Sequence, residues 1–180
     1  MKRARNKWAI FISGRGSNLA AAIDEVGEDI KLVVVSSPKA SGLLRAKRAG
    51  VSILQLPRPI NWPQLTRELK ERQINKIFLL GFMKIVPLEF IQSFSDSIFN
   101  LHPSLLPLYP GLDSIKRAYE DGANIGISVH RVIPEVDAGE ILLQKTSFDR
   151  SRDEKLSLEV TELKVHQDEQ LLVRKAIGGY

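Results

Sequence analysis

The first ninety residues alternate between short apolar runs and longer segments with apolar residues at helical spacing. The continuous apolar runs are WAIFI (8–12), IKLVVVSS (30–37), VSILQL (51–56) and KIFLLGF (76–82). Such runs are typical of strands covered on both faces, as in parallel sheets. The segments between them, at 18–26, 41–50 and 61–72, have caps or breakers near their ends. The pattern predicts an α/β fold with a doubly wound, mostly parallel twisted sheet flanked by helices.

The second half of the chain follows a different pattern. DSIFNLH (96–102) predicts a fifth strand that runs into a proline-rich loop, and GLDSIKRAYEDG (111–122) predicts a helix closed by Gly122. IGISVHRV (125–132) and EILLQKTSF (140–148) are joined by a short connection, which favours an antiparallel edge near the C-terminal part. Residues 153–177 have the periodicity of one long amphipathic helix.

Composition narrows the class of protein. With 180 residues, of which 43% are hydrophobic and 26% charged, we expect one globular domain over residues 1–180. The chain has no cysteine, which excludes disulfides and thiolate chemistry, and we expect a cytoplasmic location. The start MKRARNK predicts a flexible basic tail over residues 1–7, and the apolar run after it is too short for a signal peptide or a membrane span. The net charge is +5, but no long basic stripe is interleaved with aromatic residues, so we expect neither nucleic acid nor membrane as a partner.

A glycine-rich turn, SGRGSN, joins the first predicted strand to the first predicted helix. Gly14 and Gly16 permit close approach of the backbone, and Ser17 or Asn18 can cap the helix while its free amides face an anion. Leu19 replaces the third glycine of the dinucleotide fingerprint, and no acidic residue ends the second predicted strand. The turn therefore favours a monophosphate over a dinucleotide, although a tight turn alone would also use these glycines.

Asn100 and His102 alternate at the end of the fifth predicted strand, so their side chains point in the same direction. Open α/β sheets bind ligands at the carboxyl ends of their strands. An amide and an imidazole held before a stiff, proline-rich loop can form an oxyanion site. Asp137 lies in a predicted loop, and a carboxylate near His102 would favour the protonated ring. The pattern leaves open whether these three residues are catalytic, because a structural histidine and a turn-forming aspartate would look the same.

Metal and nucleophilic chemistry have weaker support in the sequence. His102, His130 and His166 are dispersed, without the paired short spacing of metal ligands, so we expect no metal. His130 falls within a strand pattern, where a position in the core or at the sheet edge explains it. No serine lies in a nucleophile elbow.

Several segments resemble, in the same order, the signature segments of the phosphoribosylglycinamide formyltransferases. They are ISGRGSNLAAAID, ASGLLRAKRAGV, LLGFMKIVP, FNLHPSLLPLYPG, ISVHRVIPEVDAGEILLQ and VHQDEQLL. The proline loop and VDAGEILLQ are shared across the folate-dependent formyltransferase superfamily, whereas SGRGSN and ASGLLRAKRAG favour the purine branch. The resemblance covers nearly the whole chain and implies a formyltransferase-type, Rossmann-like fold.

The resemblance implies a reaction as well as a fold. In the family a formyl group passes from 10-formyltetrahydrofolate, the formyl-donor co-substrate, directly to the amine of glycinamide ribonucleotide in purine synthesis. Asn100 and His102 match the residues that hold the formyl oxygen, and Asp137 matches the aspartate that tunes the histidine and orders water. Neither a covalent enzyme intermediate nor a metal is implied.

The resemblance also implies binding residues. The phosphate of the ribonucleotide would lie on Gly16, Ser17 and Asn18, and His166 and Glu169 would contact the ribonucleotide. The folate pterin would lie against the backbone of two loops. These loops comprise Met83, Lys84, Ile85 and Val86 in the first, and Ile133, Pro134, Glu135, Val136 and Asp137 in the second.

The sequence departs from the family at positions that bear on the substrate. The family usually has a histidine-rich stretch after YPG, where this chain has LDSIKRAY, and Trp62 lies near an expected folate-contacting arginine. Hydrolysis of 10-formyltetrahydrofolate, transfer to another amine such as an amino sugar nucleotide or initiator tRNA, and non-catalytic folate binding therefore stay open. The hydrolase usually has an added regulatory domain and the tRNA enzyme a basic C-terminal domain, neither of which we expect here. We expect small-molecule partners and a monomer or weak homodimer.

Overall fold

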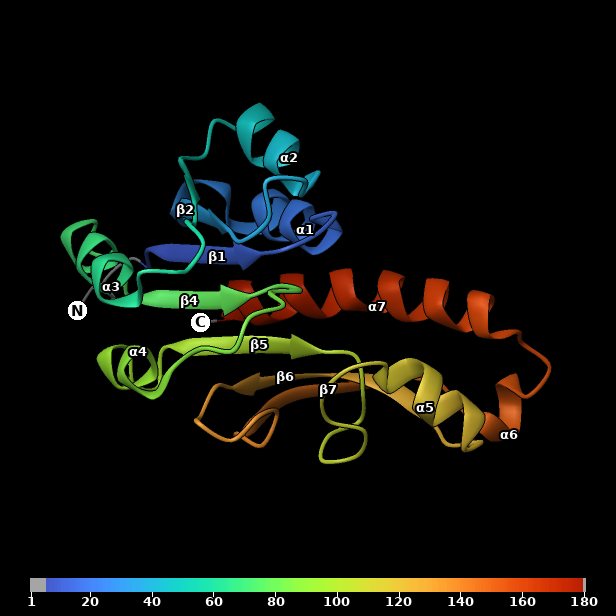
Figure 1. Ribbon diagram of the computed structural model, residues 1–180. Helices are drawn as coiled ribbons and strands as arrows, with labels where there is room; N and C mark the ends of the chain where they lie inside the picture. The colour runs from blue at the N-terminus through green and yellow to red at the C-terminus, as the bar shows by residue number, and fades with distance from the viewer. Residues whose placement is uncertain (1–5, 180) are drawn as a thin grey trace.

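The apolar runs form one sheet in the computed structural model, which describes residues 6–179 (Figure 1). The strands are β1 (Trp8–Ile12), β2 (Ile30–Val35), β3 (Ile53–Gln55), β4 (Lys76–Leu79), β5 (Ile98–His102), β6 (Ile125–Arg131) and β7 (Ile141–Phe148). Their order is β3-β2-β1-β4-β5-β6-β7. The strands from β3 to β5 are parallel, whereas β6 is antiparallel to both β5 and β7. The predicted fold class, including its antiparallel edge, is confirmed.

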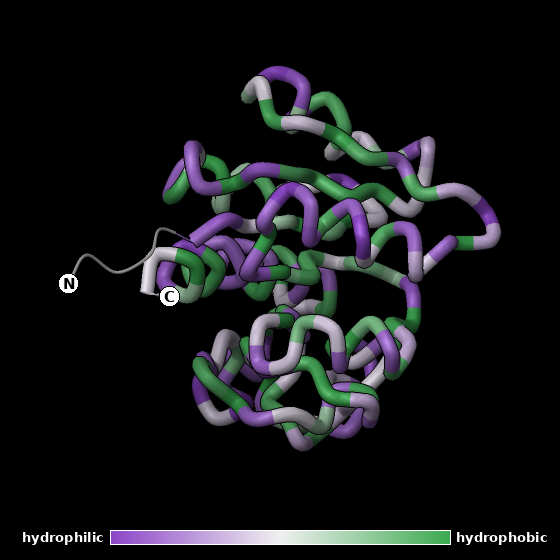
Figure 2. The backbone as a smooth tube through the Cα atoms, turned by 90° about the vertical axis from the view of Figure 1, so that its left-hand side faces the viewer, coloured by the Kyte–Doolittle hydropathy of each residue, from purple (hydrophilic) through white to green (hydrophobic). Residues whose placement is uncertain are grey.

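Helices cover the sheet on both faces. They are α1 (Ser17–Val26), α2 (Gly42–Arg48), α3 (Trp62–Glu71), α4 (Leu88–Ser93), α5 (Ser114–Glu120), α6 (Arg150–Asp153) and α7 (Leu158–Gly179), with a 3-10 turn, η1 (Gly27–Asp29). In β1, Ile10 and Ile12 belong to the core that α1 and α7 cover, whereas Ala9 and Phe11 belong to the core under α3 and α4. This alternation follows from the pleat of a strand buried on both faces. Figure 2 shows that hydrophobic and hydrophilic stretches alternate along the backbone.

β3 differs from the prediction of a doubly covered strand over 51–56. The strand is restricted to Ile53–Gln55, and Ile53 is 37% exposed. Within the described residues β3 lies at the edge of the sheet and pairs with β2 alone, so it lacks the cover that β1 and β2 receive.

The predicted continuous helix over 153–177 is also wrong. α6 ends at Asp153, and α7 begins five residues later at Leu158. The Asp153 carboxylate accepts a hydrogen bond from Lys164 Nζ at 2.8 Å, and Ser157 Oγ accepts one from the amide of Val160 at 3.4 Å. These bonds stabilise a turn between the two helices. α4 had no predicted counterpart, because its six residues are too few to reveal a helical period.

A flexible basic tail was predicted over residues 1–7, and residues 1–5 of it lie outside the described residues. Lys7 is not a free tail residue, because its amide donates to Asn75 Oδ1 at 2.8 Å and its carbonyl accepts from the Asn75 amide at 3.1 Å. In the part of the chain that the structure describes, no helix is long and apolar enough to cross a membrane.

Candidate active site

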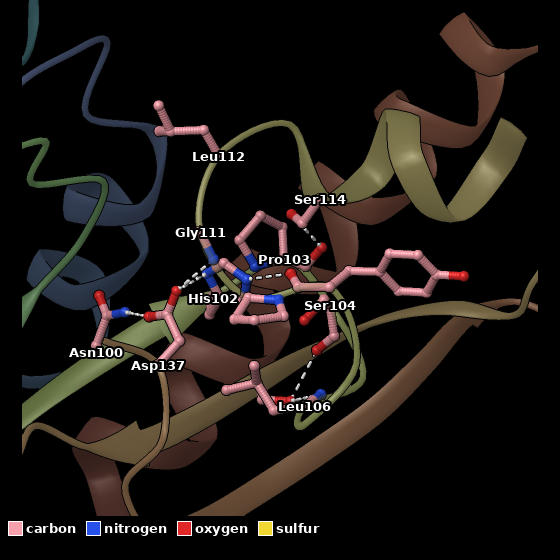
Figure 3. Close-up of polar contacts among 12 residues, drawn as sticks. Asn100, His102, Pro103, Ser104, Leu106, Gly111, Leu112, Ser114 and Asp137 are labelled. Atoms are coloured by element: carbon pink, nitrogen blue, oxygen red, sulfur yellow. Dashed lines mark hydrogen bonds and ion pairs between the residues drawn. The ribbon is translucent and has the colours of Figure 1, made fainter. Parts of the chain in front are cut away.

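Asn100 and His102 lie at the end of β5 and meet Asp137, which comes from the loop after β6 (Figure 3). Asn100 Nδ2 donates to Asp137 Oδ1 at 3.2 Å, and His102 Nδ1 lies 3.3 Å from Asp137 Oδ2. Because one carboxylate contacts both side chains, the alternation predicted from the strand period is confirmed. The structure thus brings together the three residues that the sequence singled out.

The proline loop over residues 103–111 holds this cluster in place. His102 Nε2 lies 3.0 Å from the carbonyl of Tyr109, and because a carbonyl only accepts, Nε2 carries a proton in this contact. The amide of Gly111 donates to Asp137 Oδ2 at 2.8 Å. Figure 3 shows further hydrogen bonds between side chains and backbone carbonyls around the loop. The loop therefore fixes the imidazole and the carboxylate relative to each other.

His130 on β6 completes the cluster, although the sequence predicted only a core or edge position for it. Its exposed fraction is 2%, and it pairs with Asn100 in the sheet. His130 Nε2 lies 3.1 Å from Asn100 Nδ2 and 3.4 Å from Asp137 Oδ1. The sequence signal that could have found it is a polar residue interrupting an apolar strand, but this signal does not say which residue lies opposite.

The electrostatics of the cluster centre on Asp137. Burial raises the pKa of Asp137, but hydrogen bonds from His130 and the Gly111 amide and the charges of His102 and His130 lower it further, to about 2. The side chain is 10% exposed, so a largely buried negative charge faces two imidazoles at neutral pH. Within residues 6–179, no group of three or more His, Cys, Asp and Glu residues is arranged to hold a metal ion.

The glycine-rich turn has a backbone that only glycine allows at one position. Gly16 has φ +73°, and a Cβ added there would lie 2.7 Å from Gly42 Cα. The predicted capping of α1 by Ser17 or Asn18 is wrong, because Gly16 occupies the N-cap position and no side chain caps the helix. The first amides of α1 accordingly have no acceptor within the helix.

Asn18 contacts the far end of the sequence instead of capping its own helix. Asn18 Nδ2 donates to Glu169 Oε2 at 3.0 Å, and His166 Nδ1 lies 3.0 Å from the same oxygen. This hydrogen bond raises the pKa of His166, and Glu169 is 6% exposed. Asn18 Oδ1 is buried without a partner among the described residues. The residues that the resemblance assigned to the ribonucleotide therefore converge beside the N-terminus of α1.

The two loops assigned to the folate, Met83–Val86 and Ile133–Val136, expose apolar side chains. Ile85 is 82% exposed and Val136 is 60% exposed. Sites for small molecules are lined mostly by apolar side chains with a few polar groups.

Trp62 lies near the position where an arginine was expected, but its indole ring carries no positive charge. Its ring packs against Phe90, with ring centroids 5.0 Å apart, at the start of α3. It also lines a pocket of about 400 Å³ that contains Arg58 and Lys84. The cationic side chain of Arg58 therefore lines the same pocket as Lys84 of the Met83–Val86 loop.

Comparisons with known proteins agree with this geometry. Residues 6–175 match the family model described as formyl transferase. The phosphoribosylglycinamide formyltransferase of Dictyostelium discoideum is 36% identical over 89% of this chain and 90% of its own length. The trifunctional purine biosynthetic protein adenosine-3 of Drosophila melanogaster is 37% identical over 80% of this chain, which spans only 12% of that protein.

A solved structure gives the same result in three dimensions. The phosphoribosylglycinamide formyltransferase from Anaplasma phagocytophilum is similar with a TM-score of 0.90 and 29% identity, over 97% of this chain and 86% of that one. Because the family model matches nearly all of the residues that form the sheet and the cluster, the chain belongs to the formyl transferase family.

Proposed function

We propose that this formyltransferase moves a formyl group from 10-formyltetrahydrofolate to the amine of glycinamide ribonucleotide in purine synthesis. The observation that carries the proposal is the cluster of Asn100, buried His102 and Asp137, in which one carboxylate contacts both side chains from the end of β5. The names of the relatives from Dictyostelium discoideum and Anaplasma phagocytophilum support glycinamide ribonucleotide as the acceptor.

Asn100 and His102 are the residues that we assign to the formyl oxygen. When the amine attacks the formyl carbon, negative charge develops on this oxygen, and donors held in place beforehand stabilise it. In the structure His102 Nε2 donates to the Tyr109 carbonyl at 3.0 Å, and its proton would pass from this carbonyl to the formyl oxygen when the substrate binds. No covalent bond to the enzyme is needed in a direct transfer.

We assign Asp137, together with His102, to holding the proton that the attacking amine loses. Its pKa of about 2 makes it a carboxylate at neutral pH, 3.3 Å from His102. A protonated imidazole beside this carboxylate would be the better donor to a developing oxyanion. The attacking amine must lose a proton and the folate nitrogen must gain one, and the Asp137–His102 pair offers a site where that proton can be held.

The acceptor is proposed to bind between α1 and α7. The backbone of Gly16, Ser17 and Asn18 would take the phosphate, because unpaired amides and the positive end of a helix attract anions. His166 and Glu169 would contact the rest of the ribonucleotide from α7, where they already share a hydrogen bond.

The donor is proposed to lie along the exposed loops. Its pterin ring would contact the backbone of Met83, Lys84, Ile85 and Val86 on one side and of Ile133, Pro134, Glu135 and Val136 on the other. The exposed apolar side chains of Ile85 and Val136 support this assignment.

We further propose that residues 1–180 act as one formyltransferase domain in the cytoplasm, with small-molecule partners and as a monomer or weak homodimer. The single sheet that connects the described residues supports one domain. Sedimentation velocity over a range of protein concentrations tests the assembly state, and a tight higher oligomer would contradict it.

Deformylation of the folate, followed by absorbance, tests the activity. Purified protein is mixed with 10-formyltetrahydrofolate, with and without glycinamide ribonucleotide, and His102→Ala serves as the inactive control. We expect turnover only with the ribonucleotide and only in the unmutated protein. Turnover without the ribonucleotide would instead establish a hydrolase, and no turnover in either mixture would rule out this acceptor.

A further inference from the structure

His130 has one ring nitrogen whose state the structure determines and one whose state it leaves variable. Nδ1 lies 2.8 Å from the carbonyl of Arg131, which can only accept, so Nδ1 carries a proton. Nε2 faces Asn100 Nδ2 at 3.1 Å and Asp137 Oδ1 at 3.4 Å. Nε2 can therefore accept from the amide when it has no proton, or donate to the carboxylate when it has one.

The amide group of Asn100 is turned inward. Its two amide protons face Asp137 Oδ1 at 3.2 Å and His130 Nε2 at 3.1 Å. Figure 3 shows its oxygen on the side away from Asp137. An oxygen in that position accepts hydrogen bonds and cannot donate one to a formyl oxygen.

We propose that His130 is a positioning residue whose Nε2 proton determines which end of the Asn100 amide faces the formyl oxygen. The inference rests on the proposed function, which assigns the formyl oxygen to Asn100. When Nε2 lacks a proton, it holds the NH₂ group inward, as described above. When Nε2 gains a proton from solvent, two donors face each other at 3.1 Å. Rotation about the Cβ–Cγ bond of Asn100 then turns the amide oxygen toward Nε2 and the NH₂ group toward the substrate. The Nε2 proton replaces the Asn100 amide as the donor to Asp137 Oδ1, 3.4 Å away.

Asp137 is the charge that acts most directly on this proton. The loop after β6 supplies Asp137, whose carboxylate lies 3.4 Å from His130 Nε2. From β5, His102 contacts the same carboxylate at 3.3 Å and competes for it. Glu140 binds Arg131 Nε at 2.8 Å, so these two charges largely neutralise each other. β7 presents Ile141 opposite His130, and α7 packs on the other face of β6, against the core of Ile127 and Val129.

Nuclear magnetic resonance of the full chain tests the coupling without relying on activity. The sequence has 3 histidines, so the ring nitrogens of ¹⁵N-labelled protein can be assigned completely with His130→Gln and His166→Gln. The titration covers roughly pH 5 to 9, the range in which histidine ordinarily changes charge. We expect nuclear Overhauser effects between the Asn100 NH₂ protons and the His130 ring protons beside Nε2 when His130 is neutral. We expect them to disappear with the same midpoint at which His130 Nε2 gains its proton.

Two outcomes of that titration would overturn the proposal. One is that the Asn100 contacts persist across the whole protonation of His130. The other is that they disappear with the midpoint of His102. Neither outcome depends on whether glycinamide ribonucleotide is the acceptor, so a failure of this inference is distinguishable from a failure of the proposed function.

Steady-state kinetics provide the second arm. His130→Phe keeps a ring but removes the polar nitrogens, whereas His130→Gln keeps a group that can donate to Asn100 at any pH. We expect His130→Phe to lower kcat about 100-fold with little change in KM, as for the loss of one oxyanion donor. The kcat of His130→Gln should be about ten-fold higher than that of His130→Phe. Its kcat should also no longer change with pH at the midpoint where His130 gains its proton. Equal losses in both variants would contradict the proposal.

Ser147→Ala is the matched control for a buried polar position on the neighbouring strand. Ser147 is 2% exposed, and its hydroxyl has no hydrogen-bond partner among the described residues. We expect its kcat and pH profile to equal those of the unmutated protein. A loss like that of His130→Phe would show that any buried polar change on this edge lowers kcat, which would contradict a specific role for His130.

Discussion

In β1 every residue is apolar and buried, whereas β6 buries Ser128 and His130 beside its apolar residues. The first strand is held by contacts with two cores, which need no directional partner. Each polar group on β6 has a specific partner. Ser128 Oγ donates to the carbonyl of Ser104 at 2.7 Å and accepts from the Gln144 side chain at 2.8 Å. The comparison teaches that β1 contributes stability through apolar packing, whereas β6 and its antiparallel neighbour β5 place polar groups for chemistry.

The largest expected effect is a loss of rate when a polar side chain of the β5–β6 pair is removed. We expect His102→Ala to lower kcat about 1,000-fold, because it removes the side chain that we propose as a donor to the oxyanion and as a carrier of the proton. Single-turnover deformylation of 10-formyltetrahydrofolate measures this change. The free energy of unfolding should fall much less, because Asn100, His130 and the Gly111 amide still contact Asp137. If His102→Ala lowered the free energy of unfolding but left the rate per folded molecule unchanged, this position would serve stability and not chemistry.

The next effect is on stability and comes from the parallel region. Leu32 on β2 is fully buried in the core under α3 and α4. Leu32→Ala should lower the free energy of unfolding by about 3 kcal/mol, because it removes apolar contacts and leaves a cavity. Urea denaturation measures the change, and kcat per folded molecule should stay the same.

Ile53→Ala is the control for that measurement, since Ile53 on the edge strand β3 is 37% exposed. It should cost well under half as much, roughly 1 kcal/mol, because less apolar area leaves the core. Equal costs at the two positions would show that burial does not explain the stability of the parallel region.

A smaller effect depends on pH and arises at Asp137. Its pKa falls from 3.8 to about 2 in the folded protein. A lowered carboxyl pKa stabilises the fold above the unfolded value, and this contribution is lost as the pH falls from about 4 to about 2. At about 1.4 kcal/mol per pKa unit, the contribution is about 2 kcal/mol.

Chemical denaturation at pH values from about 5 to 2 measures this contribution as the difference between the unmutated protein and Asp137→Asn. Other carboxyl groups titrate in both proteins and cancel in the difference. The two proteins should converge in stability toward the acid end. A constant difference across this range would show that the charge of Asp137 does not contribute to folding.

The sequence predicted the sheet well because strand and helix periods depend on neighbours along the chain. The break between α6 and α7 escaped prediction, since the hydrogen bonds of Asp153 and Ser157 interrupt a period that continues across them. The restriction of β3 to Ile53–Gln55 was not predicted for a different reason. Whether a strand lies at the edge of a sheet is decided by its spatial neighbours and not by its own residues.

The candidate site was predictable only in part. Strand alternation placed Asn100 and His102 together, and the glycine-rich turn marked the start of α1. The place of His130 required the register of β5 against β6, in which Asn100 lies opposite His130. No local pattern sets this register. The contact between Asn18 and Glu169 likewise depends on how α7 docks, and only the resemblance to a known family pointed to both residues.

The hydrogen bond between Asn18 and Glu169 joins residues that are 151 positions apart. Contacts of such separation require the ends of a long loop to meet, and they are established late compared with local structure. During synthesis, β1, α1 and β2 emerge long before α7, so the early strands can collapse while one wall of the proposed ribonucleotide site is still missing. The nascent protein would then complete this proposed site in the last stage of folding, and any delay in α7 docking would postpone activity more than it postpones compaction.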